Sequence, residues 1–249
     1  MSRAAGNLAG RLAAEREFHD RRYSDGDQRQ DQMKYYWAVD DGAQRYADLV
    51  AELAIGAAVL EYGCGLGSRG GELASVVKSF HAIDISEAAI RQAAAAVTAT
   101  NVHYEVMDAM KLAYPDASFD LVYGSGIVHH LDTEVAAREV ARVLRPGGTA
   151  LFWEPLGYNP VINVYRALTP SARTVDEHPL LARDFALMRR HFSSVEPTFF
   201  GLTSIAAVPL RPSRIGMPVR SALLWLDRAL FRVPGLGMMA WYALIRCTR

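Results

Sequence analysis

The sequence predicts an α/β fold in which a mostly parallel sheet of seven strands carries helices on both faces. From about residue 55, short apolar runs that suit buried strands alternate with stretches of helical pattern, as they do in parallel sheets. A glycine-rich turn follows the first of these runs. The 249 residues, of which 51% are hydrophobic, suffice for one sizeable core. We therefore expect a single domain over 1–249, with a helical cap (1–54), a central core (55–154) and a last part (155–249) that completes the sheet.

The elements are expected in the following order. Strands are predicted at 59–62, 80–84, 102–107, 119–124, 149–154, 195–202 and 238–247. Helices are predicted at 43–53, 68–78, 133–144, 180–190 and 221–231, and Ser86 is expected to cap another helix after the second strand. Two earlier helices are expected, one ending near 25–27 and one beginning around Gln28. After Glu154 the alternation breaks, and the prolines of 155–177 indicate an insertion over the ligand-binding edge of the sheet.

The most informative segment, residues 59–71, reads VLEYGCGLGSRGG. Its glycines at alternate positions, Gly63, Gly65 and Gly67, let the backbone turn sharply and let a ligand approach closely. The turn would lie at the carboxyl edge of the sheet, where open α/β folds bind nucleotides. Glu61, just before the glycines, presents a negative charge there, which suits a cationic ligand better than a pyrophosphate. Gly65, Gly67 and Gly70 also fit the dinucleotide pattern G-x-G-x-x-G, so a nicotinamide cofactor is an alternative.

The pattern E-x-G-x-G-x-G resembles the first motif of class I S-adenosylmethionine (SAM) dependent methyltransferases. The resemblance extends over about 55–154 and includes the acid Asp84 after the second strand, the acid Asp108 after the third, and the segments FDLVYGSGIVHHL (119–131) and RVLRPGGTALFWE (142–154). It points to the small-molecule branch of the methyltransferase type 11 kind. It implies a Rossmann-like sheet of seven strands whose last strand enters antiparallel.

The resemblance also implies which residues bind the cofactor, SAM. Asp84 would accept hydrogen bonds from the ribose hydroxyls, and charge-assisted bonds of this kind are strong. Asp108 would lie beside the adenine amino group, whereas Gly124 and Ser125 would pass the methionine moiety. The complete set of expected cofactor residues is Glu61, Gly63, Gly65, Gly67, Asp84, Ile85, Asp108, Ala109, Met110, Gly124 and Ser125.

Methyl transfer from SAM is a single in-line displacement, so the enzyme mainly has to position the reactants. A base is needed only when the acceptor must lose a proton. His129 and His130 follow the fourth strand, and they are the candidate bases because the histidine side chain in general titrates near neutrality. Glu154, at the end of the fifth strand, is a third candidate that could touch the acceptor. The chemistry requires no metal, and the adjacent Asp176, Glu177 and His178 are not expected to converge on one.

The acceptor site is expected between the cap and the insertion. Tyr35, Tyr36 and Trp37 form an aromatic cluster in the cap that could close over the cofactor, and Tyr158 adds an apolar wall from the insertion. These side chains favour a small, partly hydrophobic organic acceptor, and methylation on oxygen or nitrogen is the first interpretation. The family resemblance points the same way and implies a role in secondary metabolism. C-methylation of an alkene or an electron-rich ring is the next interpretation. More remote interpretations are an NAD-dependent oxidoreductase and a catalytically silent, SAM-binding partner protein.

Composition bounds the remaining possibilities. The 27 basic and 27 acidic residues give a net charge of zero, so the composition does not indicate a surface that binds nucleic acid. The most apolar late stretch, 233–245, is too short to span a bilayer, and the N-terminus lacks the apolar core of a signal peptide. The two cysteines, Cys64 and Cys247, have no metal-ligand or redox spacing. We therefore expect a cytoplasmic monomer or homodimer without a membrane span.

Overall fold

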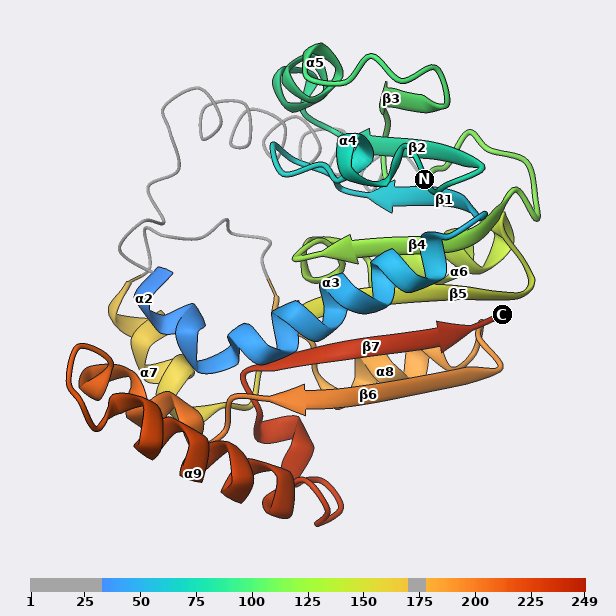
Figure 1. The fold of residues 1–249 in the computed structure, drawn as a ribbon. Coiled ribbons are helices and arrows are strands. Elements are labelled where there is room, and N and C mark those ends of the chain that lie inside the picture. Colours follow the sequence, from blue (N-terminus) through green and yellow to red (C-terminus); the bar gives the residue numbers. More distant parts are fainter. Residues whose placement is uncertain (1–32, 170–177) are drawn as a thin grey trace.

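The computed structural model of the chain describes residues 33–169 and 178–249. The described residues form a seven-stranded sheet with the order β3-β2-β1-β4-β5-β7-β6 (Figure 1). Its strands are β1 (Ala58–Tyr62), β2 (Ser79–Asp84), β3 (Val102–Val106), β4 (Phe119–Ser125), β5 (Leu144–Pro155), β6 (Ser194–Phe200) and β7 (Tyr242–Thr248). Strands β1 to β5 pair in parallel, and β7 enters antiparallel to both β5 and β6. The predicted sheet is thus confirmed.

Helices cover both faces of this sheet. The α-helices are α2 (Met33–Tyr36), α3 (Asp40–Ala54), α4 (Gly70–Leu73), α5 (Glu87–Ala95), α6 (Thr133–Val143), α7 (Pro160–Leu168), α8 (Ala182–Met188) and α9 (Gly216–Leu230). Short 3₁₀ turns lie at Trp37–Val39, Val128–His130, Ser204–Leu210 and Leu236–Met239. Within the described residues, no helix is both long enough and apolar enough to cross a bilayer.

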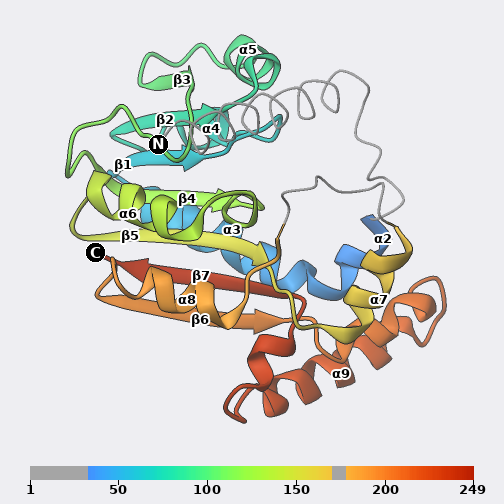
Figure 2. The same cartoon turned by 180° about the vertical axis from the view of Figure 1, so that it is seen from behind.

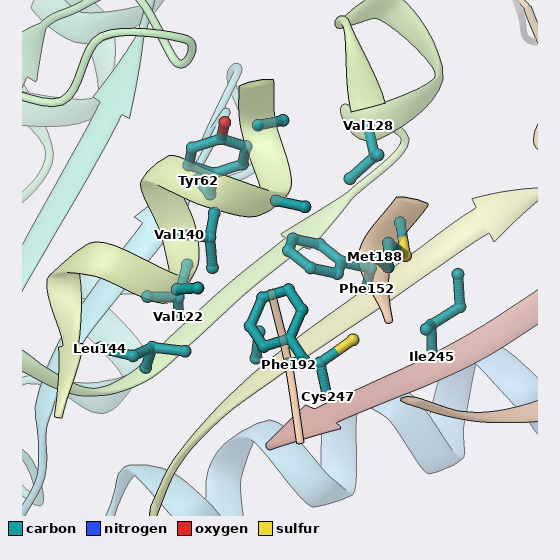
Figure 3. Packing of buried hydrophobic residues seen from close by; sticks show 14 of the residues in the cluster. Tyr62, Val122, Val128, Val140, Leu144, Phe152, Met188, Phe192, Ile245 and Cys247 are labelled. Atoms are coloured by element: carbon teal, nitrogen blue, oxygen red, sulfur yellow. The ribbon is translucent and has the colours of Figure 1, made fainter. Parts of the chain in front are cut away.

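The sheet separates two layers of core. On one face, α3 crosses β4, β5 and β7, whereas α6 and α8 lie on the opposite face (Figures 1 and 2). Figure 3 shows the second layer, where Val140 of α6, Met188 of α8 and Phe192 pack against Val122 and Phe152 of the strands. Because the central strands are buried from both sides, their sequences are continuous apolar runs rather than alternating ones. Their carboxyl ends meet at a single edge, which therefore positions the site.

Helix α3, in the predicted cap, packs into the core against the sheet. Its residues Val50 and Ala54 are fully buried against the sheet, so only α2 and the 3₁₀ turn at Trp37–Val39 lie before it in the described part of the predicted cap. The helices expected before residue 33 fall outside the described residues. The division into 1–54, 55–154 and 155–249 remains a prediction.

Several elements differ from their predicted bounds by a few residues, and three differences are structural. The helix expected over 68–78 is a single turn, α4, and the helix-disfavouring Gly70 and Gly71 stand at its start. Strand β5 begins at Leu144 rather than 149, because the RPGG segment stays on the sheet through backbone bonds to Arg249. Helix α7, which the sequence analysis missed, is capped by the Asn159 side chain and has Pro160 in its first turn. The predicted cap Ser86 is confirmed, since its hydroxyl accepts from the Ala89 N–H.

Candidate functional site

The glycine loop after β1 is fixed against the end of β2. The N–H groups of Gly63 and Cys64 both donate to the Ile83 carbonyl at 2.9 Å, and the Gly65 N–H donates to Asp84 Oδ2 at 2.8 Å. Gly63 and Gly65 have φ values of +74° and +49°, in the left-handed region that glycine adopts without strain. A Cβ at Gly63 would approach the Ile127 side chain to 2.8 Å. The glycine is therefore required both by its backbone conformation and by its neighbour.

Glu61 lies beneath this loop rather than at the surface. Only 5% of it is exposed. Its Oε2 accepts from the Ser68 hydroxyl at 2.5 Å, and its Oε1 accepts from the Arg69 N–H at 3.2 Å. Burial raises the pKa of Glu61 from 4.5 to about 7. Both oxygens are thus engaged in holding the far end of the loop, and the expected contact of Glu61 with a cofactor stays a prediction.

Two carboxylates follow neighbouring strands at the same edge. Asp84 ends β2, where its Oδ1 accepts from the Ser86 N–H at 2.8 Å in addition to the bond from Gly65. Asp108 follows β3 and accepts from the Met110 N–H at 2.8 Å, while the Ala109 carbonyl accepts from the Tyr62 hydroxyl at 2.6 Å. Strands β2 and β3 pair at Asp84 and Val106. The two acids therefore lie on adjacent strand ends, both partly exposed.

These residues fit a nucleoside. An ionised carboxylate has about four acceptor positions, so the Asp84 carboxylate retains positions for two hydroxyl groups beside its two backbone bonds. A Cβ at Gly67 would meet no atom within 4 Å, which leaves open space over the loop. Ile85, Ala109 and Met110 are all partly buried around the two acids.

The end of β4 meets the glycine loop at Ile127. A Cβ at Gly124 would come within 2.7 Å of the Ile127 side chain and of the Tyr62 carbonyl. Gly126, with φ +67°, turns the chain after the exposed Ser125 and donates its N–H to the Trp153 carbonyl at 2.9 Å. The loops that follow β1 and β4 are thus packed against each other through one side chain.

His129 and Glu154 form a buried pair at the ends of β4 and β5. The distance from His129 Nδ1 to Glu154 Oε2 is 2.7 Å, and the two residues are 5% and 0% exposed. The other oxygen of Glu154 accepts from the N–H groups of Ile127 and Val128, each at 2.9 Å. Glu154 therefore fixes both the 3₁₀ turn and the imidazole. Its complete burial argues against the expected direct contact of Glu154 with an acceptor.

The second candidate base lies beside the first. The His129 and His130 rings have centroids 4.2 Å apart, and His130 is partly exposed. The backbone N–H of His178, at the end of the insertion, donates to the His129 carbonyl at 2.9 Å. Asp176 and Glu177 lie outside the described residues, and within those described no group of three or more metal-ligating side chains is gathered.

The expected aromatic residues divide into two groups. Tyr35 and Tyr36 line an apolar pocket together with Val161, Ile162, Tyr165, Ile205 and Trp241. Tyr36 stacks on Trp241, and Tyr35 lies 5.2 Å from Tyr165 between ring centroids. Trp37 instead faces the Arg220 guanidinium at 5.2 Å, and Tyr158 is 45% exposed and outside the pocket lining.

Helix α7 and Trp241 contribute to this pocket although neither was expected there. The signal for α7 was present, because an Asn-Pro pair before a stretch with apolar residues at positions 161, 162 and 165 starts an amphipathic helix. Trp241 falls within the predicted last strand, 238–247, but directly precedes the observed β7, and only the antiparallel entry of β7 brings it to the carboxyl edge of the other strands.

Residues 60–152 match the family model of a methyltransferase domain. Among curated proteins, the O-methyltransferase cnsE of Penicillium expansum is 34% identical over 128 residues, which are 49% of this chain and 46% of that protein. Ajmaline N-methyltransferase of Rauvolfia serpentina is 30% identical over 159 residues, 60% of this chain and 49% of that protein. The chain thus spans about half the length of the curated relatives it matches.

A solved structure supports the same assignment at the level of the fold. An S-adenosylmethionine dependent methyltransferase from Mesorhizobium loti aligns with a TM-score of 0.58 at 22% identity, covering 84% of this chain and 99% of that one. The likeness extends beyond the segment that the family model matches. The strand order, the glycine loop and this match over the cofactor motifs together show that residues 60–152 form a methyltransferase domain, and that the fold is similar to that of the class I, SAM-dependent methyltransferases.

Proposed function

We propose that this protein transfers a methyl group from SAM to the oxygen or nitrogen of a small, partly hydrophobic organic acceptor. The observation that carries the proposal is the arrangement at one sheet edge. The glycine loop, Asp84 and Asp108 lie at three strand ends, and the buried pair of His129 and Glu154 lies at the next two.

Each part of the edge has a task in binding the cofactor. Asp84 accepts the ribose hydroxyls, Asp108 lies beside the adenine amino group, and Ala109 and Met110 line the adenine pocket beside Ile85. Gly63, Gly65 and Gly67 let the backbone approach the amino-acid part, and the Gly124 and Ser125 carbonyls face its ammonium group. Glu61 acts by holding the loop. When bound, SAM supplies a methyl group that its sulfonium already activates.

His129 removes the acceptor proton in this proposal. With its proton on Nδ1 directed at Glu154, the neutral imidazole has Nε2 as its basic nitrogen. The negative charge of Glu154 then stabilises the imidazolium that forms. Glu154 therefore acts through His129, and His130 is the alternative base at the same turn.

The apolar pocket between α2 and α7 is the proposed place for the hydrophobic part of the acceptor. Tyr35 and Tyr36 contribute to it, so the expected role of these two residues is kept. Trp37 and Tyr158 are better explained by packing against Arg220 and by surface exposure. The two relatives named above support methylation on oxygen or nitrogen of a secondary metabolite.

The first experiment is calorimetric titration of the purified protein with SAM, S-adenosylhomocysteine and NAD. Binding of the first two, with none of NAD, is expected. Asp84→Ala should weaken SAM binding by about 1.5–3 kcal/mol, the usual value of hydrogen bonds to a charged group. Asp48→Ala, an exposed carboxylate on α3, is the control. Binding of NAD alone, or unchanged SAM affinity in Asp84→Ala, would contradict the proposal.

A second experiment tests catalysis. Transfer of a labelled methyl group from SAM should be detected with members of a panel of phenols, alcohols and heterocyclic amines. His129→Ala should leave SAM affinity unchanged and lower turnover by about a hundredfold or more. If SAM binds but no acceptor in a wide panel is methylated, a SAM-binding partner protein becomes the better interpretation.

A further inference from the structure

Helix α9 has an inverted distribution of side chains. A surface helix normally buries an apolar stripe and exposes its charges. In α9 the most buried side chains are instead Arg220 and Asp227, at 7% and 2% exposure. These two residues are seven positions apart and therefore lie on the same side of the helix. The helix is thus attached to the protein by its charged side.

Both buried charges are anchored by specific bonds. Arg220 pairs with Asp40 and Asp41 at the start of α3. Asp227 accepts hydrogen bonds from the backbone and hydroxyl groups of Thr203 and Ser204. Because these contacts fix the rotation of the helix about its axis, its opposite side must face outward.

The outward side of α9 is apolar. Trp225 is 71% exposed, and Met217 and Leu226 are also exposed. The structure describes the whole of α9, and the polar residues among its exposed positions are only Ser221 and Arg228. Exposed apolar side chains continue beyond both ends of the helix, at Ile215 and Val233. In both views α9 lies at the periphery of the molecule, beyond β6 (Figures 1 and 2).

Within residues 197–249, all of which the structure describes, the exposed charges are all positive. Arg211 and Arg214 precede α9, Arg228 lies on it with its guanidinium 5.8 Å from the Trp225 ring, and Arg232 follows it. All four are exposed. Across residues 197–249 the sequence contains a single acid, the buried Asp227. The outward side of 211–233, here called the α9 face, is therefore apolar at its centre and cationic at its rim.

We propose that the α9 face binds the surface of a bilayer that contains anionic lipids. An amphipathic helix that lies in the plane of a membrane interface combines apolar side chains, tryptophan and basic residues in this way. Trp225 and Leu226 enter the boundary between headgroups and acyl chains, and the four arginines contact the anionic headgroups, which attract basic residues near the bilayer surface. This inference does not rest on the proposed methyl transfer.

A second copy of the chain is a poorer occupant of the α9 face. A twofold dimer places the same patch on both sides of its interface. The arginines of one protomer would then face those of the other, with no exposed acid in 197–249 to compensate them. An anionic bilayer offers acyl chains to the apolar centre of the α9 face and negative headgroups to its cationic rim.

The proposal is tested by flotation of the full chain with vesicles. Wild type should bind vesicles of equal phosphatidylglycerol and phosphatidylcholine, bind phosphatidylcholine alone far more weakly, and be released by salt. Tryptophan fluorescence should shift to shorter wavelength on binding, and Trp225→Phe should remove the shift. Trp225→Ser/Leu226→Ser and Arg228→Glu/Arg232→Glu should each reduce binding by about tenfold or more.

Two variants outside the α9 face are matched controls. Ile55→Ser replaces an exposed apolar side chain, 70% accessible, at the end of α3, and Arg138→Glu reverses an exposed arginine on α6. Both should bind vesicles as the wild type does, and circular dichroism should show that all variants are folded. Absence of wild-type binding, or equal loss in the controls, would overturn the proposal. So would a dimer in solution that Trp225→Ser/Leu226→Ser dissociates while vesicles are ignored.

Discussion

His129 and Glu154 are joined by a hydrogen bond of 2.7 Å between Nδ1 and Oε2, at the carboxyl ends of two adjacent strands. The second oxygen of the same carboxylate receives the N–H groups of Ile127 and Val128. One buried acid therefore sets the backbone of the turn and the orientation of the ring that this turn carries. The side chain of Ile127 packs against Gly63 of the glycine loop and against Gly124 at the end of β4. Ile127 therefore connects the turn that carries the proposed base to the cofactor loop.

Glu154→Gln tests this arrangement. An amide has one acceptor and one donor end, so it can receive the two backbone N–H groups only by presenting its NH₂ to His129. Nδ1 must then accept, which places the ring proton on Nε2 and removes the basic nitrogen. We expect turnover to fall by about a hundredfold or more with SAM affinity unchanged.

The tautomer of His129 is observable without any activity, by nitrogen-15 NMR of the histidine ring. The variant should show the proton on Nε2 where the wild type shows it on Nδ1. Full turnover in Glu154→Gln would mean that His129 does not act as the base.

Glu61 makes stability depend on pH. Burial raises its pKa in the folded protein to about 7, against 4.5 for an ordinary glutamate. A raised pKa means that the folded state holds its proton more tightly, so the contribution to stability is full below pH 4.5 and is lost as pH rises to 7. The shift corresponds to a loss of about 3 kcal/mol.

Glu61→Gln removes this dependence. A glutamine can still accept from the Arg69 N–H and can donate to the Ser68 hydroxyl, so the loop contacts are conserved. Urea unfolding from pH 5 to 8 should show a falling free energy of unfolding in the wild type relative to the variant. Parallel curves for the two proteins would show that Glu61 is ionised in the fold throughout this range.

Gly63→Ala separates backbone strain from a steric clash. Gly63 and Gly56 have φ values of +74° and +68°, so alanine at either position costs about 1–2 kcal/mol of strain. Only at Gly63 would the new Cβ meet a side chain, that of Ile127 at 2.8 Å, since nothing lies within 4 Å at Gly56. Calorimetry should therefore show weaker SAM binding in Gly63→Ala and normal binding in Gly56→Ala.

A second substitution checks the cause. Shortening the clashing side chain in Gly63→Ala/Ile127→Ala should restore part of the lost SAM affinity. If Gly56→Ala weakens SAM binding as much as Gly63→Ala does, the effect is one of general stability and not of the loop.

The apolar pocket makes a prediction about acceptor binding. Tyr36→Ala removes a ring that stacks on Trp241 in the pocket wall, so KM for a methylated acceptor should rise by about tenfold, with SAM affinity unchanged. Val164→Ala shortens an exposed side chain of α7 that is not in the pocket lining and serves as the control. Equal kinetics in Tyr36→Ala and wild type would place the acceptor elsewhere.

Much of the fold could be predicted from the sequence because local and global signals agree in its central part. Each buried strand is a short apolar run, and the positions of Gly63, Asp84, Asp108 and Gly124 follow from where those runs end. What could not be predicted depends on contacts between distant segments. That the fully buried Glu154 holds His129 follows from its hydrogen bonds to the turn after β4. That Trp37 packs on Arg220, some 180 positions along the chain, follows from the docking of α9.

Asp227 should be far more important for stability than Trp225, although an apolar aromatic residue is usually the more valuable of the two. The Asp227 carboxylate is 2% exposed and receives bonds from the Leu202, Thr203 and Ser204 backbone and from two hydroxyl groups. Asp227→Ala would leave several buried donors without an acceptor, at a cost of about 3 kcal/mol or more. Trp225→Ser removes a ring that is 71% exposed, and its cost should stay within about 0.5 kcal/mol. Urea unfolding of the two variants at one pH measures the difference. A larger loss in Trp225→Ser would mean that the Trp225 ring is covered in solution, by a second copy or by another part of the chain.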